Sequence, residues 1–100
     1  MLMVEGWLMF APDDVDAMLP HIAVFTAATR AEAGCLHHAV GRDIADPAVF
    51  RVTERWQDDR ALTAHAGGAV LAAFEAALDA HPPVLSDVRL YTVGEVRRVM

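Results

Sequence analysis

The most restrictive feature of the sequence is its first apolar segment, Leu2–Phe10, which carries large apolar side chains at both odd and even positions. The segment is too short for a typical helix and Pro12 ends it, so it predicts a strand. Side chains alternate between the faces of a strand, and an antiparallel sheet usually leaves one face in water. Both faces of this strand are therefore expected to be covered.

A helix is expected after Pro12, because Asp13 or Asp14 can cap it and apolar residues follow at helical spacing until Gly34. Pro20 lies inside this pattern. It either kinks the helix or begins a new one in its first turn, and the pattern does not decide between the two. The residues expected to face the core are Val15, Met18, Leu19, Ile22, Phe25 and Thr29.

The remaining segments predict two more strands, a second helical stretch and a last strand. Cys35–Arg42 and Val49–Trp56 predict two strands of a hairpin. Asp58 or Asp59 can cap a second helical stretch, which Gly67 and Gly68 should break into two, because glycine inside a helix costs about 1 kcal/mol relative to alanine. Its expected apolar stripe comprises Leu62, Ala66, Val70, Leu71, Phe74 and Leu78, and the last strand is expected at Val88–Val96 with a bend at Gly94.

The order of these elements is βαββαβ. It predicts a single α+β domain over residues 1–100 with a ferredoxin-like fold, in which helices cover one face of a four-stranded antiparallel sheet. The helices cannot cover the second apolar face of the first strand. We therefore expect a homodimer in which two sheets pack face to face.

Composition limits the partners and the compartment. The formal net charge is −6 and the sequence has no lysine, which argues against binding to nucleic acid or to anionic membrane surfaces. Cys35 is the only cysteine, so neither an internal disulfide nor a multi-cysteine zinc site is possible. The sequence shows no secretory signal pattern and no apolar run long enough to span a bilayer, so a cytoplasmic protein is expected.

Three sequence stretches resemble the antibiotic biosynthesis monooxygenase family: Glu32–Asp43 (EAGCLHHAVGRD), Phe50–Trp56 (FRVTERW) and Ala61–His65 (ALTAH). The resemblance covers roughly residues 1 to 95. It implies a dimeric α+β barrel and, less strongly, a monooxygenase that works without a cofactor, since one fold can serve many functions.

The sequence departs from the family pattern at three points. His38 stands where the family often has tyrosine, and Val70 stands where a second histidine is common. The sequence also has no asparagine, although related enzymes that oxidise aromatic polyketides or degrade haem use one. These departures disfavour haem degradation and leave the mechanism open.

Strand alternation places Glu54 and Trp56 on one face of their strand, and His38 on one face of its neighbour, together with Leu36 and Val40. His65 lies on the helix that must fold back over the sheet. If these faces coincide, the four polar and aromatic side chains meet between sheet and helices, where a ligand pocket is natural.

In such a pocket His65 or His38 can act as the base, with Glu54 as its partner. Arg55 or a histidine cation can stabilise an anion, and Trp56 or Trp7 can stack on a flat substrate. Each of these residues can equally be a packing residue, and Cys35 is expected to be a small buried apolar side chain. His37 and His38 point to opposite faces of a strand, so no metal site is expected.

The favoured hypothesis is a cofactor-independent monooxygenase that oxidises a small aromatic, phenolic or quinol compound with molecular oxygen. The alternative is a non-catalytic dimer with a small-molecule-binding or regulatory role. A third hypothesis is a different enzyme on the same fold, such as an isomerase or a muconolactone-type enzyme. An enclosed cavity lined by His38, Glu54 and His65 together would favour the first hypothesis over the second.

Overall fold

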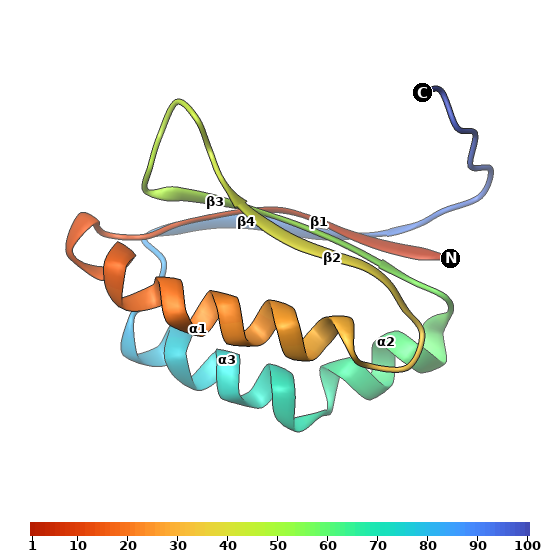
Figure 1. Ribbon diagram of the computed structural model, residues 1–100, viewed down its shortest axis with the longest axis horizontal. Helices are drawn as coiled ribbons and strands as arrows, with labels where there is room; N and C mark the ends of the chain where they lie inside the picture. Colours follow the sequence, from red (N-terminus) through yellow and green to blue (C-terminus); the bar gives the residue numbers. More distant parts are fainter.

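The computed structural model describes residues 1–100, and its helices lie against one face of a four-stranded antiparallel sheet (Figure 1). Across the sheet the strands follow the order β2-β3-β1-β4. The ferredoxin-like βαββαβ order is confirmed, with the second helical stretch in two pieces. The elements are β1 (Leu2–Met9), α1 (Pro12–Arg30), β2 (Cys35–Arg42), β3 (Val49–Trp56), α2 (Asp59–Ala66), α3 (Ala69–Ala80) and β4 (Leu85–Thr92).

Helix α1 begins at Pro12, whose missing N–H group is not needed in a first turn. Ala11 is the N-cap residue and no side chain caps the helix, so the prediction of a cap by Asp13 or Asp14 is wrong. Both acids lie inside the first turn, where their negative charges interact favourably with the positive end of the helix dipole. The helix continues through Pro20 as one element, and the predicted core stripe is buried except for Leu19.

Strand β2 contains an irregularity that sequence parity did not predict. A register shift separates Cys35, which lies opposite Trp56, from His37, which lies opposite Arg55. The extra residue of such a bulge breaks the alternation of faces. Leu36 is therefore 53% exposed instead of sharing the covered face with His38 and Val40, as the sequence predicted.

Strand β4 begins earlier and ends earlier than the predicted Val88–Val96. It pairs only with β1, from Leu85 opposite Met9 to Thr92 opposite Leu2. The last paired residue is Thr92, and the N–H group of Val93 donates one further hydrogen bond to the carbonyl oxygen of Met1 at 3.0 Å, so the strand stops before the predicted bend at Gly94. A glycine is required at Gly6 of β1, since a Cβ atom there would lie 2.0 Å from the carbonyl oxygen of Asp87.

The second helical stretch is divided into two helices at the two glycines, as the sequence predicted. Asp58 caps α2 by accepting a hydrogen bond from the backbone N–H of Ala61 at 2.9 Å. Gly67 and Gly68 separate α2 from α3. Neither helix, nor α1, is long and apolar enough to cross a membrane alone, although α2 and α3 reach that length and composition as a pair bent by 50°.

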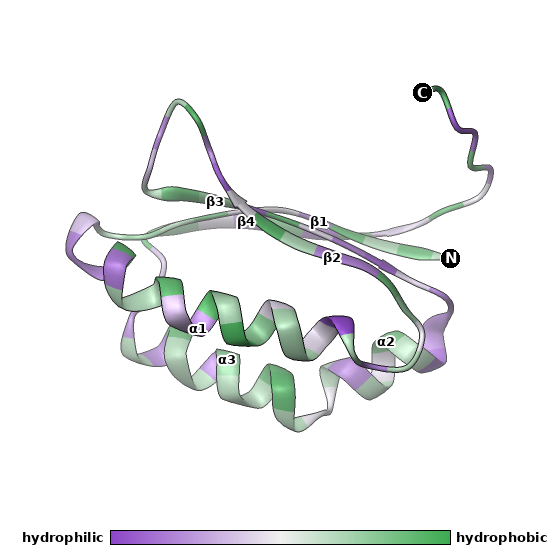
Figure 2. Ribbon diagram, viewed as in Figure 1, coloured by the Kyte–Doolittle hydropathy of each residue, from purple (hydrophilic) through white to green (hydrophobic).

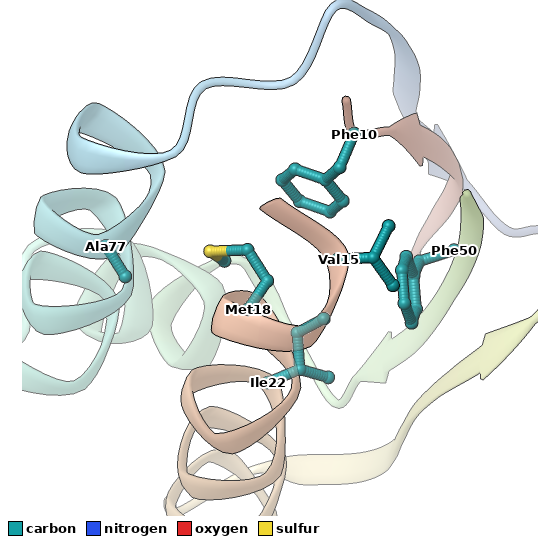
Figure 3. Packing of buried hydrophobic residues seen from close by; sticks show 6 residues of the cluster. All are labelled: Phe10, Val15, Met18, Ile22, Phe50 and Ala77. Carbon is teal, nitrogen blue, oxygen red and sulfur yellow. The ribbon is translucent and has the colours of Figure 1, made fainter. Parts of the chain in front are cut away.

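The apolar core lies at the end of the sheet where β1 leads into α1 (Figure 3). Phe10 and Phe50 meet edge to face there, with ring centroids 5.8 Å apart. Figure 2 shows apolar residues along α1 and α3, interrupted by polar ones. The buried cluster comprises Phe10, Val15, Met18, Ile22, Phe50 and Ala77.

Candidate active site

Strand β3 places two of the predicted site residues on the face of the sheet that the helices cover. Glu54 and Trp56 are both buried, and they lie on one face because they are two residues apart in a strand. The indole Nε1–H of Trp56 donates a hydrogen bond to Oε1 of Glu54 at 2.9 Å. This bond orients the indole and uses one oxygen of the carboxylate.

His38 lies directly opposite Glu54 on the neighbouring strand β2 and is 1% exposed. Its Nε2 atom is 3.3 Å from Oε2 of Glu54, within the range of an ion pair. The geometry does not make a hydrogen bond, and neither ring nitrogen has another partner. The hydroxyl groups of Thr26 and Thr29 on α1 are buried without a partner as well. This part of the interface therefore leaves polar atoms unsatisfied, which costs stability.

The environment of Glu54 keeps its carboxylate charged. Burial alone would raise the pKa of Glu54, but the contacts from His38 and Trp56, and the charge of the nearby imidazoles, outweigh burial. The pKa of the carboxyl group consequently lies below its ordinary value of 4.5. At neutral pH the centre of this cluster therefore holds a negative charge.

His65 of α2 completes the cluster and has a carboxylate partner that the sequence analysis did not assign. Its ring centroid lies 4.6 Å from that of Trp56, and it is 4% exposed. Its Nδ1 atom is 3.1 Å from Oε1 and 3.2 Å from Oε2 of Glu32. A carboxylate can only accept hydrogen bonds, so Nδ1 carries the proton and Nε2 is the basic nitrogen.

The turn after α1 brings Glu32 to His65. Gly34 in this turn has a φ of +80°, which favours glycine, and a Cβ atom there would lie 2.4 Å from Cβ of Ala61 on α2. The turn can therefore rest directly against α2. The only signal for Glu32 in the sequence was its place in the stretch that resembles the family, where no role was attached to it.

Two of the predicted substrate-binding residues do not join this cluster. Arg55 lies between Glu54 and Trp56 in β3, so its side chain points to the opposite face of the sheet. Trp7 of β1 lies opposite Arg51, which is on the same face as Arg55. Both side chains therefore lie on the outer face of the sheet, which the helices do not cover. The structure brings together His38, Glu54, Trp56 and His65, and separates Trp7 and Arg55 from them.

Cys35 is partly buried, and burial is the main cause that raises the pKa of its thiol. A raised pKa favours the uncharged thiol over the nucleophilic thiolate. No group of three histidine, cysteine, aspartate or glutamate side chains is arranged to hold a metal ion. The chemistry available at this cluster is therefore that of imidazoles, carboxylates and one indole.

Two surface hollows lie near the clustered residues. A hollow of about 420 Å³ at the edge of β2 includes His38. A groove of about 320 Å³ between α1 and α3 reaches Phe25 but includes none of the clustered residues. Phe25 packs edge-on against His38 with ring centroids 5.0 Å apart. His38, Glu54 and His65 thus meet, but neither of these two hollows is lined by all three.

The fold and this helix-covered cluster define a ferredoxin-like α+β protein with a buried histidine–carboxylate site. The profile of the family described as antibiotic biosynthesis monooxygenase matches residues 1–81. The chain belongs to the antibiotic biosynthesis monooxygenase family. No curated protein matches its sequence.

Solved structures with similar folds cover nearly the whole chain. A "putative antibiotic biosynthesis monooxygenase" from Deinococcus radiodurans superposes with a TM-score of 0.91 at 25% identity, over 100% of this chain and 99% of that one. A structure named antibiotic biosynthesis monooxygenase has a TM-score of 0.85 at 27% identity, over 95% and 100%. The protein PA3566 from Pseudomonas aeruginosa has a TM-score of 0.82 at 26% identity, over 93% and 94%.

Proposed function

We propose that the protein is a monooxygenase that oxidises a small aromatic, phenolic or quinol compound with molecular oxygen and without a cofactor. One observation carries the proposal: the buried His65 ring lies against Trp56 while Glu32 holds its Nδ1–H group. Nε2 is then the basic nitrogen, and its tautomer is fixed in advance. A positioned imidazole of this kind suits a general base near neutral pH. Membership of the family supports the same reaction class.

In the proposed reaction His65 removes a proton from the substrate, and the resulting anion delivers electrons to molecular oxygen. With an anthrone, the CH₂ group becomes a carbonyl group that keeps one oxygen atom, and the other oxygen atom leaves as water. The carbon gives up the four electrons that reduce O₂, so the reaction consumes no external reductant. Trp56 offers a flat surface for the rings, and the imidazole of His38 beside Glu54 is the group that would stabilise the anion when it carries a proton.

The test is oxygen uptake with a panel of quinols and anthrones. His65→Gln should lower turnover about 100-fold or more, because it removes the base. His81→Gln is the matched control, since His81 at the end of α3 also pairs through Nδ1 with a carboxylate, Asp14, at 2.9 Å but lies outside the cluster. Equal turnover in both variants would remove His65 from the mechanism.

A second candidate function is a non-catalytic protein that binds the same class of compound. The linings of the two nearby hollows favour it, because neither brings His38, Glu54 and His65 together, whereas a ready enzyme usually keeps a preformed cavity. Under this hypothesis the wild-type protein consumes no oxygen with any compound of the panel, yet quinols quench the fluorescence of Trp56 in a Trp7→Phe variant in a saturable way. Oxygen uptake that requires His65 would reject it.

We also propose that a second copy of the chain covers the outer face of the sheet. Met3, Trp7 and Met9 lie on this face of β1 at positions facing away from the helices, and Tyr91 of β4 beside them is exposed. Only 16 of the 100 residues are buried within one chain, which leaves apolar surface for an interface.

Sedimentation at micromolar concentration tests this assembly. The wild-type protein should sediment as a dimer and Trp7→Glu as a monomer, because a charge would be buried at the interface. A monodisperse wild-type monomer would contradict the assembly without affecting the proposed chemistry.

A further inference from the structure

The hollow at the edge of β2 is lined by three side chains that can carry a positive charge and by no acidic one. Its lining comprises Arg30, Cys35, Leu36, His37 and His38, and its volume is about 420 Å³. The chain as a whole has a formal net charge of −6, so this lining differs from the average of the molecule. A hollow lined by groups of one sign attracts ligands of the opposite sign. The hollow therefore suits an anionic ligand.

Arg30, the last residue of α1, is anchored at this hollow and has no acidic partner. Its Nε–H group donates a hydrogen bond to the carbonyl oxygen of His38 at 2.8 Å. This bond orients the guanidinium group, while its two Nη groups make no hydrogen bond or ion pair. Guanidinium groups bind carboxylates through two parallel N–H···O bonds. Arg30 therefore offers an oriented pair of donors to a carboxylate.

The acidic residues of the neighbouring cluster do not neutralise Arg30, because both have other partners. Glu32 holds the Nδ1–H group of His65 at 3.1 Å. Glu54 accepts a hydrogen bond from the indole of Trp56. The positive charge of Arg30 therefore stays available to a ligand.

The pKa of His37 reflects the positive charges around this hollow. Partial burial lowers the pKa of His37 from its ordinary value, and the charges of Arg55, Arg30 and His38 lower it further. A bound anion would oppose these charges and raise the pKa of His37. This histidine therefore reports whether an anion occupies the hollow.

The bulge in β2 gives the hollow an apolar wall. Leu36 lies between Cys35 and His37, where the register shifts, and it is 53% exposed while lining the hollow. Bulges are common next to functional sites, because they redirect a side chain. A ligand that Arg30 holds by its carboxylate can therefore place an apolar group against Leu36.

We propose that the hollow at the edge of β2 binds a small organic acid, whose carboxylate pairs with the two Nη groups of Arg30 and whose apolar body lies against Leu36. His38, whose ring nitrogens have no hydrogen-bond partner, belongs to the same lining, so the ligand lies beside it. Glu54 and His65 do not line this hollow. The site therefore goes beyond the proposed function, and binding holds whether or not the cluster is catalytic.

Isothermal titration calorimetry with 2-naphthoate and its neutral counterpart 2-naphthamide tests the site. Arg30→Gln should weaken binding of 2-naphthoate about tenfold or more and leave binding of 2-naphthamide unchanged, because only the carboxylate pairs with the guanidinium group. Arg30→Lys, which keeps the charge without the paired donors, should fall between the two. Arg60→Gln is the matched control, since Arg60 is another exposed arginine without an acidic partner and lies outside this lining.

Leu36→Ser tests the apolar wall independently of Arg30. Leu36 is exposed, so its replacement leaves the fold intact. The variant should bind 2-naphthoate more weakly than the wild type, because the ring loses its apolar contact.

Nuclear magnetic resonance titration of His37 separates binding from a purely structural role of Arg30. In the wild-type protein 2-naphthoate should raise the pKa of His37 and 2-naphthamide should leave it unchanged. In Arg30→Gln the pKa of His37 should rise without any ligand, and 2-naphthoate should no longer change it.

Equal affinity of the wild type and Arg30→Gln for 2-naphthoate would overturn the site, as would equal affinity of the wild type for 2-naphthoate and 2-naphthamide. The same weakening in Arg60→Gln would overturn it too, because the effect would then come from net charge. Inorganic phosphate that binds as tightly as 2-naphthoate would show a general anion site and overturn the assignment to an organic acid.

Discussion

The interface between α1 and the sheet has two ends, which the same elements fill in opposite ways. At one end, Ile22 of α1 and Phe50 of β3 belong to an entirely apolar cluster. At the other end, the polar residues Thr29 of α1 and Glu54 of β3 are buried, and Glu54 lies against the imidazole of His38. Since burying unsatisfied polar atoms costs free energy, the polar end contributes less to stability than the apolar end. The comparison indicates that stability depends more on the apolar end, and the proposed chemistry belongs to the polar end.

The largest effect is expected at the apolar end. Phe50→Ala should lower the free energy of unfolding by about 3–5 kcal/mol, because it removes a buried ring that packs against Phe10 and leaves a cavity. Urea unfolding measures the change, and Phe50→Leu should lower the free energy of unfolding much less than Phe50→Ala does. A loss below about 1 kcal/mol in Phe50→Ala would mean that this end does not hold the stability of the chain.

A matched pair of substitutions, one at each end, should change the free energy of unfolding in opposite directions. Thr29→Val removes a fully buried hydroxyl group that has no partner, and should raise the free energy of unfolding by about 1 kcal/mol. Val15→Thr creates such a group in the apolar cluster and should lower it by about 1–3 kcal/mol. Both are measured by urea unfolding. Destabilisation by Thr29→Val would show that its hydroxyl group is satisfied after all.

The smallest expected effect is a pH dependence confined to the polar end. The pKa of Glu54 is depressed in the folded protein, so its contribution to stability is present above its ordinary value of 4.5 and lost as the pH falls below it. Glu54→Gln should flatten the fall in thermal stability between pH 5 and about pH 3 relative to the wild type. Phe50→Leu should keep the wild-type dependence of thermal stability on pH. Parallel curves for Glu54→Gln and the wild type would contradict the depressed pKa.

The sequence predicted those parts of the site that depend on regular alternation. Glu54 and Trp56 lie on one face because β3 is regular throughout, and the same alternation puts Arg55 on the other face. Leu36 departs from the prediction because parity cannot reveal a bulge. Trp7 could be placed only once the register of β1 against β3 was known.

Features that depend on tertiary contacts were beyond sequence patterns. The contact of Glu32 with His65 joins residues 33 positions apart and depends on how a turn rests on α2. The bounds of β4 depend on its register against β1. The course of the chain through Pro20 depends on packing of the helix around it, which local preference does not determine.

The turn at Gly34 also determines when the site can form during folding. Helix α2 has only eight residues, too few for a stable isolated helix, so His65 gains a fixed position only after the turn docks on Ala61. The Glu32–His65 pair should therefore be among the last contacts to form. A partly folded chain would carry the base without its partner, and the nuclear magnetic resonance signal of the His65 Nδ1 proton would report completed folding.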